Sequence, residues 1–180
     1  MAILKSFYTP ERCTPIMSFK GGYDWLSNFY PCDVDINVHF DSDNSIYTAH
    51  FSNAEAAFQA CKCMTFSEFK QFEKLGPSEA KKLGRKVKLR DDWEETKVNV
   101  MKQILHQKFI QNIELADRLI ETYPHQLIEG NTWNDKFWGV CDGVGENMLG
   151  KCLMSVRLEL IMTMIIYDHE RSDKNAESNQ

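Results

Sequence analysis

The chain has 180 residues, 43% of them hydrophobic, and a formal net charge of −5. This length fits one domain, since domains typically run ~100–200 residues, and it can bury a substantial core. The acidic balance excludes a general affinity for phosphate backbones, because nonspecific nucleic-acid binding needs positive charge, but one phosphate can still bind in a local basic pocket.

The sequence also lacks several signals. The longest apolar stretch, residues 158–167, contains Glu159 and falls short of the ~20 apolar residues that a membrane-spanning helix needs. The N-terminal segment has no apolar signal-peptide region, so we expect a cytoplasmic protein. The six cysteines form no CxxC pair and no HExxH motif occurs, so we expect reduced, buried thiols and predict neither a metal nor a cofactor.

Residues 16–50 are predicted to form strands and turns. Asp33–Phe40 alternates polar and apolar residues, which is typical of a half-buried strand. Asp41–Asn44 is predicted to be a turn, with Ile46–Thr48 as the returning strand. From Asn53 the pattern becomes helical. The predicted packing stripe of this helix consists of small or apolar residues at i, i+3, i+4 and i+7: Ala57, Ala60, Cys61 and Met64.

Helices dominate the rest of the chain. Two short ones are predicted near Ser67–Lys74 and Pro77–Leu83, with Gly84 just past the end of the second. A long helix follows at about Trp93–Phe109, and Asn112 is predicted to cap another that ends before Pro124. The buried stripe of the long helix is predicted to be Met101, Ile104, Leu105 and Phe109.

The C-terminal third is predicted to hold a short strand, His125–Asn131, a polar loop with two tryptophans, and a last helix at about Asn147–Asp168. The fold class we expect is therefore α+β: a helix-dominated single domain, residues 1–169, with a small β-sheet. Residues 170–180 are charged and lack large apolar side chains, so we expect a disordered tail.

The first segment that can carry chemistry is Ser52–Lys62. At ~100° per residue, Glu55, Gln59 and Lys62 fall on one helix face, opposite the packing stripe, where they can line a polar pocket. The alternative is a capping box formed by Ser52 and Glu55, in which the carboxylate only reaches back to a backbone N–H.

The second segment is Leu83–Trp93, which has four cations in six residues: Arg85, Lys86, Lys88 and Arg90. Gly84 allows tight backbone geometry beside Arg85, whose guanidinium can bind a phosphate through two hydrogen bonds. The alternative is a solvated basic turn. Trp93 is either a core anchor or a wall against which a base or ribose stacks.

The third segment, Glu129–Gly150, combines tryptophans, short polar side chains and glycines, a composition that suits a ligand-binding loop. Its polar side chains include Asn131, Asn134, Asp135 and Asn147, placed among Trp133 and Trp138. The GVGENMLG stretch within it can bring backbone N–H groups to an anion at the start of the last helix.

Taken in order, these segments resemble the NADAR family of YbiA-like N-glycosidases from about Phe19 to Arg157. The matching features are Trp25-Leu26-Ser27-Asn28-Phe29, Glu55 with Gln59 and Lys62, Leu83-Gly84-Arg85, Trp93, Lys108-Phe109, Ile128-Glu129, Asn134-Asp135, Trp138-Gly139, Gly145, Asn147, Leu149-Gly150, Leu153-Met154 and Arg157. The chain departs from the family at Ala56, where a histidine often follows the key glutamate.

The resemblance implies a pocket for ribosyl or ADP-ribosyl N-glycosides. Family members cleave early riboflavin-pathway ribosylamino-pyrimidine phosphates or remove ADP-ribose from guanine. By the resemblance, the key glutamate is Glu55, the loop aspartate is Asp135, and the functional tryptophans are Trp93 and Trp138. We expect a small nucleotide-like substrate, with ADP-ribosylated guanine in nucleic acid as the alternative. We expect no membrane partner, and the sequence does not predict the oligomeric state.

The resulting hypothesis makes Glu55 the general acid or base, assisted by Asp135. Lys62 orients Glu55, protonates the leaving group, or attacks an opened sugar as an amine. Arg85, with Lys108, is expected to bind phosphate, and Trp93 and Trp138 to flank the base or ribose. The resemblance adds four residues to the substrate-binding set: Asn28, Phe29, Gln59 and Asn147. The alternative function is a non-catalytic ADP-ribose-binding module.

Overall fold

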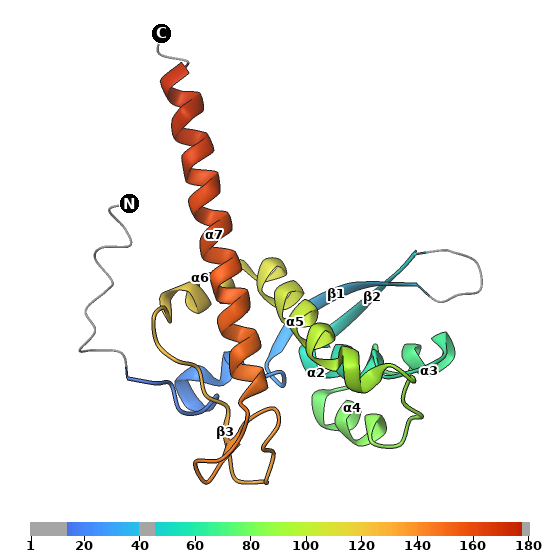
Figure 1. Ribbon diagram of the computed structural model, residues 1–180. Helices are drawn as coiled ribbons and strands as arrows, with labels where there is room; N and C mark the ends of the chain where they lie inside the picture. Colours follow the sequence, from blue (N-terminus) through green and yellow to red (C-terminus); the bar gives the residue numbers. More distant parts are fainter. Residues whose placement is uncertain (1–13, 40–45, 178–180) are drawn as a thin grey trace.

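The computed structural model describes the backbone of residues 14–39 and 46–177. Its elements, in chain order, are the 3-10 helix η2 (Gly21–Leu26), β1 (Pro31–His39), β2 (Ile46–Asn53), α2 (Ala54–Ala60), α3 (Phe66–Lys70), α4 (Pro77–Gly84), α5 (Trp93–Gln111), α6 (Ile113–Glu121), β3 (Gly130–Asn131), β4 (Val140–Cys141) and α7 (Met148–Glu177). Figure 1 shows the β1–β2 hairpin beside α2, α3 and α5, with α7 extending past the other elements. The predicted α+β, helix-dominated fold class is confirmed.

β1 and β2 form an antiparallel hairpin, as the alternating pattern predicts. The apolar residues of the two strands lie opposite each other in three pairs: Val34 and Phe51, Ile36 and Ala49, Val38 and Tyr47. β2 runs past the predicted end at Thr48 and continues to Asn53, where α2 begins. Phe40 and the predicted turn Asp41–Asn44 lie outside the described residues.

α2 is surrounded by other elements. All of its residues are buried, because β1, β2, α3, α4 and α5 pack around it. The helix ends at Ala60, so the predicted stripe that continues through Cys61 to Met64 is wrong, and Met64 is 43% exposed. The prediction assumed an amphipathic helix, whereas a helix enclosed on all sides buries its polar face as well.

The helices between residues 66 and 121 follow the prediction more closely. α3 is shorter than predicted. Gly84, which was predicted to lie just past α4, is the last residue of that helix. The predicted stripe of α5 is buried: Met101, Ile104, Leu105 and Phe109. Asn112 precedes α6, but its side chain does not cap the helix and instead donates to the carbonyls of Asp33 and Lys108, both at 2.7 Å.

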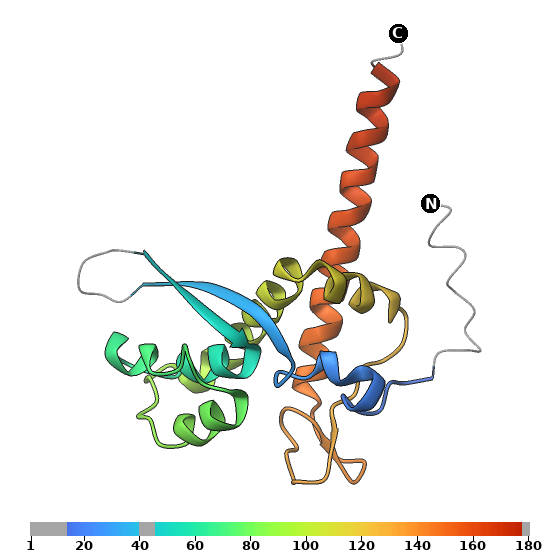
Figure 2. The ribbon, with the colours of Figure 1, turned by 180° about the vertical axis from the view of Figure 1, so that it is seen from behind.

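The C-terminal third differs most from the prediction. The predicted strand His125–Asn131 reduces to β3, which pairs in parallel with β4. α7 continues to Glu177, so residues 170–177 are helical where the sequence predicts a disordered tail. No proline or glycine interrupts the helix after Gly150. Figures 1 and 2 view the molecule from opposite sides, and both show α7 extending beyond the other elements. None of the described helices is long and apolar enough to cross a membrane.

Candidate active site

Glu55 lies in the first turn of α2 and its side chain is buried. Asn53 precedes the helix as its cap and accepts a hydrogen bond from the Ala56 N–H at 2.8 Å. The capping-box alternative with Ser52 is therefore wrong. Glu55 is 6% exposed, and one of its carboxyl oxygens accepts a 2.8 Å hydrogen bond from Gln59 Nε2. Gln59 is one helical turn further along the same face.

The surroundings of Glu55 pull its pKa in two directions. Burial raises the pKa of the carboxyl and is the larger effect. Four neighbours favour the ionised form and lower the pKa: Lys81, Gln59, Lys62 and Asn28. A buried carboxyl with such neighbours can exchange a proton closer to neutral pH than a solvated one, as general acid–base catalysis requires.

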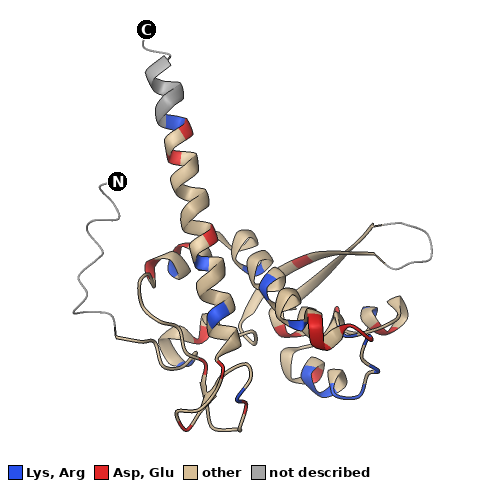
Figure 3. Ribbon diagram, viewed as in Figure 1, with Lys and Arg blue, Asp and Glu red and all other residues tan. Residues whose placement is uncertain are grey.

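Two cations, Lys62 and Lys81, act on this carboxyl, and a third, Arg85, acts on Lys62. Burial lowers the pKa of Lys62, Glu55 raises it, and Lys81 and Arg85 lower it further. Lys81 and Arg85 are four residues apart along α4 and its end, so they extend from the same helix face. Figure 3 shows lysines and arginines gathered over α4 and the segment after it. Because like charges repel, an anion bound among them would be favoured.

A second carboxyl, Glu129, belongs to the same region. Burial raises its pKa to about 7, with Asp135 raising it as well and Lys20 and Lys81 lowering it. Lys81 acts on Glu55 and on Glu129, so both carboxyls lie within electrostatic range of one ammonium group. The site therefore contains two carboxyls with raised pKa values.

We refer to seven residues as the Glu55 cluster: Asn28, Glu55, Gln59, Lys62, Lys81, Arg85 and Glu129. Among the described residues, four buried side-chain polar atoms lack a hydrogen-bond partner in the protein. Three of these atoms belong to the cluster: Asn28 Oδ1, Gln59 Oε1 and Glu129 Oε2. An unsatisfied buried polar atom costs about 1–3 kcal/mol. Gln59 Oε1 lies against Gly84, so the two atoms that a water or a ligand can satisfy are Asn28 Oδ1 and Glu129 Oε2.

Aromatic residues connect α2 to the tryptophan loop. The Phe58 ring centre lies 5.1 Å from that of Trp93 and 5.3 Å from that of Trp138. Trp93 is 4% exposed, which favours the core-anchor alternative. Trp138 is half-buried, and Phe29 is 37% exposed with Lys81 Nζ 5.4 Å from its ring centre. Trp138 and Phe29 therefore have aromatic surface to offer a ligand, as does Trp133 of the same loop, which is 54% exposed.

The side chain of Lys108 is bonded to the backbone inside the protein. It is fully buried, and its ammonium donates to the carbonyls of Trp25 and Ser27 at 2.7 and 2.8 Å. Burial lowers the pKa of Lys108 to about 8. These two bonds hold the turn that leads into Asn28, and the Asn28 carbonyl in turn accepts from the Glu55 N–H at 3.0 Å.

The side-chain oxygens of Asp135 and Asn147 also accept hydrogen bonds from backbone N–H groups. Asp135 Oδ1 accepts hydrogen bonds from the N–H groups of Phe137 and Trp138 at 3.2 and 2.9 Å. Asn147, at a φ of 54°, accepts from the Glu129 N–H at 3.0 Å through its side-chain oxygen. These residues position Trp138 and Glu129, respectively.

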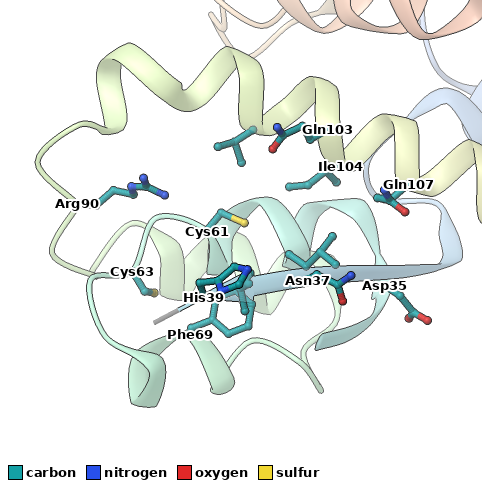
Figure 4. A pocket seen from close by; sticks show the side chains of 13 residues that line it. Asp35, Asn37, His39, Cys61, Cys63, Phe69, Arg90, Gln103, Ile104 and Gln107 are labelled. Atoms are coloured by element: carbon teal, nitrogen blue, oxygen red, sulfur yellow. The ribbon is translucent and has the colours of Figure 1, made fainter. Parts of the chain in front are cut away.

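A cavity of about 530 Å³ lies elsewhere, between β1, the end of α2 and α5 (Figure 4). Arg90, from the predicted basic segment, lines it, but its guanidinium is held by Asp92 through bonds of 2.5 and 2.7 Å. Asn37 Oδ1, also in the wall, accepts a 2.8 Å hydrogen bond from Thr48 Oγ1. The lining includes no member of the Glu55 cluster.

Sequence reasoning missed two members of the cluster. Lys81 lies in the predicted helix Pro77–Leu83, but Arg85 lies past its predicted end, so helical periodicity did not pair them; the observed α4 runs to Gly84, directly before Arg85. Glu129 stands in the Ile128-Glu129 motif, but nothing in its local sequence indicates that its carboxyl is buried. Its side chain packs closely against Gly139 of the same loop, where an added Cβ would meet Glu129 Cγ at 3.1 Å.

Comparison with known proteins gives a consistent result. The NADAR domain model matches residues 15–161. The chain is 32% identical over 161 residues to a riboflavin biosynthesis protein of Vibrio vulnificus, covering 86% of this chain and 38% of that protein. It is 37% identical over 149 residues to N-glycosidase YbiA of Shigella flexneri serotype 5b, covering 79% and 85%. The chain thus spans well under half of the Vibrio relative and most of the Shigella one.

A solved structure extends the likeness to three dimensions. The NMR structure of the E. coli protein YbiA matches with a TM-score of 0.71 and 28% sequence identity, over 88% of this chain and 90% of that one. The YbiA-like fold and the resemblance predicted from sequence are both confirmed.

Proposed function

The chain belongs to the NADAR domain family, and from this membership and the Glu55 cluster we propose that it is a hydrolase that cleaves the N-glycosidic bond of a ribosyl phosphate compound. The observation that carries the proposal is the buried Glu55 carboxyl, bonded to Gln59 and set among cations. The names of the relatives, N-glycosidase and riboflavin biosynthesis protein, support this reaction class.

The reaction breaks the bond between ribose carbon 1 and the nitrogen of the base, and water supplies the new hydroxyl. Positive charge builds on the ribose ring while the electron pair leaves with the base. Two protons must move, one from the attacking water and one to the leaving nitrogen. A carboxylate can accept the first, and a protonated carboxyl can donate the second.

The two carboxyls of the cluster suit these two tasks. We assign Glu55, in its ionised form and oriented by Gln59, to stabilising the ribose cation and accepting the proton of water. Glu129, whose pKa of about 7 leaves it half-protonated at neutral pH, is assigned to protonating the leaving base. Lys62 acts electrostatically on Glu55 and orients it. Asp135 orients Trp138 instead of taking a proton.

The cations supply the phosphate anchor. Lys81 and Arg85 extend from one face of α4 and repel Lys62 electrostatically, and a phosphate dianion among them relieves that repulsion. Lys81 replaces the predicted Lys108 in this role, because the Lys108 ammonium already donates to two backbone carbonyls.

The base would stack on the exposed aromatic surface of Phe29 or Trp138. We favour a ribosylamino-pyrimidine phosphate as substrate, because two relatives are named for riboflavin biosynthesis and the net charge of −5 does not favour nucleic acid. ADP-ribosylated guanine is the second substrate class to test.

A non-catalytic ADP-ribose-binding module is the other candidate function. The observation that favours it is Ala56, which replaces the histidine common in the family and is fully buried. A binder would retain affinity for ADP-ribose and release no base from any substrate.

The test uses Glu55→Gln, which keeps the size of the side chain and removes its charge. Base release from a ribosylamino-pyrimidine phosphate and from ADP-ribosyl-guanine is followed by mass spectrometry, while calorimetry measures ribose 5-phosphate binding. We expect the variant to bind the phosphate and to lose base release by ~10²–10⁴-fold. Full activity in the variant excludes Glu55 as the acid or base, and binding without turnover in the unaltered chain supports the binding module.

A further inference from the structure

Asn28 lies in the turn between η2 and β1 and is 6% exposed. Its backbone carbonyl accepts a hydrogen bond from the Glu55 N–H at 3.0 Å, and its amide nitrogen donates to Met101 Sδ at 3.3 Å. The amide oxygen, Oδ1, is buried and has no hydrogen-bond partner in the protein. Asn28 therefore holds the start of α2 and keeps one acceptor unused beside Glu55.

The orientation of this amide group follows from its neighbour Glu55. The Asn28 side chain acts on the Glu55 carboxyl as a hydrogen-bond donor and lowers its pKa. Only the amide nitrogen can donate, and an amide oxygen turned toward a carboxylate would be repelled by it. The nitrogen therefore faces Glu55 and Met101, and Oδ1, bonded to the same carbon, presents its lone pairs beside the carboxyl.

The nearby donors of the protein are already in use. Gln59 Nε2 donates to Glu55, and the Lys108 ammonium donates to the carbonyls of Trp25 and Ser27. Buried amide oxygens are almost always hydrogen-bonded, and one without a donor destabilises the folded state. The donor that Oδ1 lacks is therefore expected from a molecule bound at the site.

The chemistry of a ribosyl phosphate narrows the choice of donor. A phosphate dianion offers only acceptors, so it does not suit an amide oxygen. The ribose ring carries hydroxyl groups, which donate. One of them is on carbon 2, next to carbon 1, where Glu55 acts in the proposed function. An acceptor beside the Glu55 carboxyl is therefore placed for the 2-hydroxyl.

With Glu55 at ribose carbon 1, as in the proposed function on which this step rests, we propose that Asn28 Oδ1 accepts a hydrogen bond from the ribose 2-hydroxyl. The site then selects ribosyl over 2-deoxyribosyl compounds. A site built to bind a substrate hydroxyl rejects the analogue that lacks it, because the buried acceptor stays unpaired. The selectivity is therefore expected in binding, before any bond breaks.

Calorimetry of the full chain with ribose 5-phosphate and 2-deoxyribose 5-phosphate tests the proposal. The unaltered chain should bind the ribose compound roughly 10–100-fold more tightly. Asn28→Leu keeps the size of the side chain and removes the oxygen, so it should bind both compounds with similar affinity. Met101→Leu is the matched control: it alters a neighbour of the amide nitrogen, leaves Oδ1 in place and should keep the preference.

The possible results separate this proposal from the proposed function. Equal affinities of the unaltered chain for the two compounds overturn the proposal and leave the hydrolase assignment standing; this comparison needs no variant, so it holds even if Asn28→Leu does not fold. A preference that survives Asn28→Leu overturns the proposal, as does an equal loss of affinity for both compounds in that variant, because Asn28 would then only position Glu55. No binding of either compound overturns the proposed function as well, whereas selective binding without base release supports the selectivity and overturns the hydrolysis.

Discussion

The Glu55 cluster and the cavity of Figure 4 share no residue, and they differ in how many of their polar groups lack a hydrogen-bond partner. The cavity offers about 530 Å³, but Arg90 is paired with Asp92, and Asn37 with Thr48. The Glu55 cluster holds three buried polar atoms without a protein partner and three cations that repel one another.

This difference shows that space alone is a weak guide to function. A cavity whose wall groups already have hydrogen-bond partners gains little free energy from binding a polar ligand. A buried polar group without a partner gains the full free energy of each new hydrogen bond. The predictions that follow concern residues in or beside the Glu55 cluster, and each of the four substitutions has a matched control elsewhere.

The largest effect is expected for Glu129→Gln. The variant removes the proposed proton donor, so kcat should fall about 10²-fold or more. In the unaltered chain kcat should fall as the pH rises through about 7, where Glu129 loses its proton, and this limb of the pH–rate profile should vanish in the variant. Glu146→Gln, an exposed carboxyl in the same loop, should change neither quantity. An unchanged limb in Glu129→Gln contradicts the assignment.

The same group makes stability depend on pH. The folded-state pKa of Glu129, about 7, exceeds the ordinary value of 4.5, so the folded protein binds this proton more tightly than the unfolded chain. The free energy of unfolding should therefore fall as the pH rises from 4.5 to about 7. Chemical denaturation across this range should show a shallower fall in Glu129→Gln.

Lys81→Met should weaken phosphate binding. A hydrogen bond to a charged group contributes roughly 1.5–3 kcal/mol, so KM should rise about 10–100-fold with a smaller change in kcat. Lys82→Met alters the next, exposed residue of α4 and should leave KM unchanged. Equal KM values in both variants would remove Lys81 from the phosphate anchor.

Gly84→Ala tests the packing behind the cluster. A Cβ at this position would lie 1.9 Å from Gln59 Oε1 and 3.1 Å from Gln59 Cβ, so Gln59 must move and its bond to Glu55 is lost. We expect the free energy of unfolding to fall by about 1–3 kcal/mol, with a loss of activity. Gly22→Ala meets nothing within 4 Å and should be neutral in both assays.

The smallest effect is expected for Phe29→Leu. Aromatic stacking contributes about 0.5–1.5 kcal/mol, so KM should rise roughly 2–10-fold while the thermal midpoint stays nearly constant. Tyr23→Leu, a similarly exposed aromatic residue on η2, serves as the comparison. A rise in KM only for Tyr23→Leu would move the stacking surface away from Phe29.

Much of the fold was predictable because its signals are local. The helix Trp93–Gln111 has a buried stripe at helical spacing, and β1 alternates in the usual way. The start of α2 was harder to predict, because Ser52 and Asn53 are both good caps. The choice between them depends on how far β2 pairs with β1, which is a tertiary contact.

The candidate site was predictable in part for the same reason. Glu55 and Gln59 are one turn apart, and their hydrogen bond follows from helix geometry. Lys108 was expected to bind phosphate, but its burial beneath the Trp25–Ser27 turn depends on contacts more than eighty residues away in sequence. Glu129 was overlooked for the same reason, since Lys81 of α4 and the loop around Gly139 contribute to its surroundings.

The most direct test of the central claim, that the Glu55 cluster and not the cavity binds the ribosyl phosphate, is a titration of ¹⁵N-labelled protein with ribose 5-phosphate followed by amide chemical shifts. The account predicts the largest shifts at Asn28–Phe29, at Glu55 and along Lys81–Arg85. Shifts confined to Asn37, Gln103 and their neighbours in the cavity wall would contradict it.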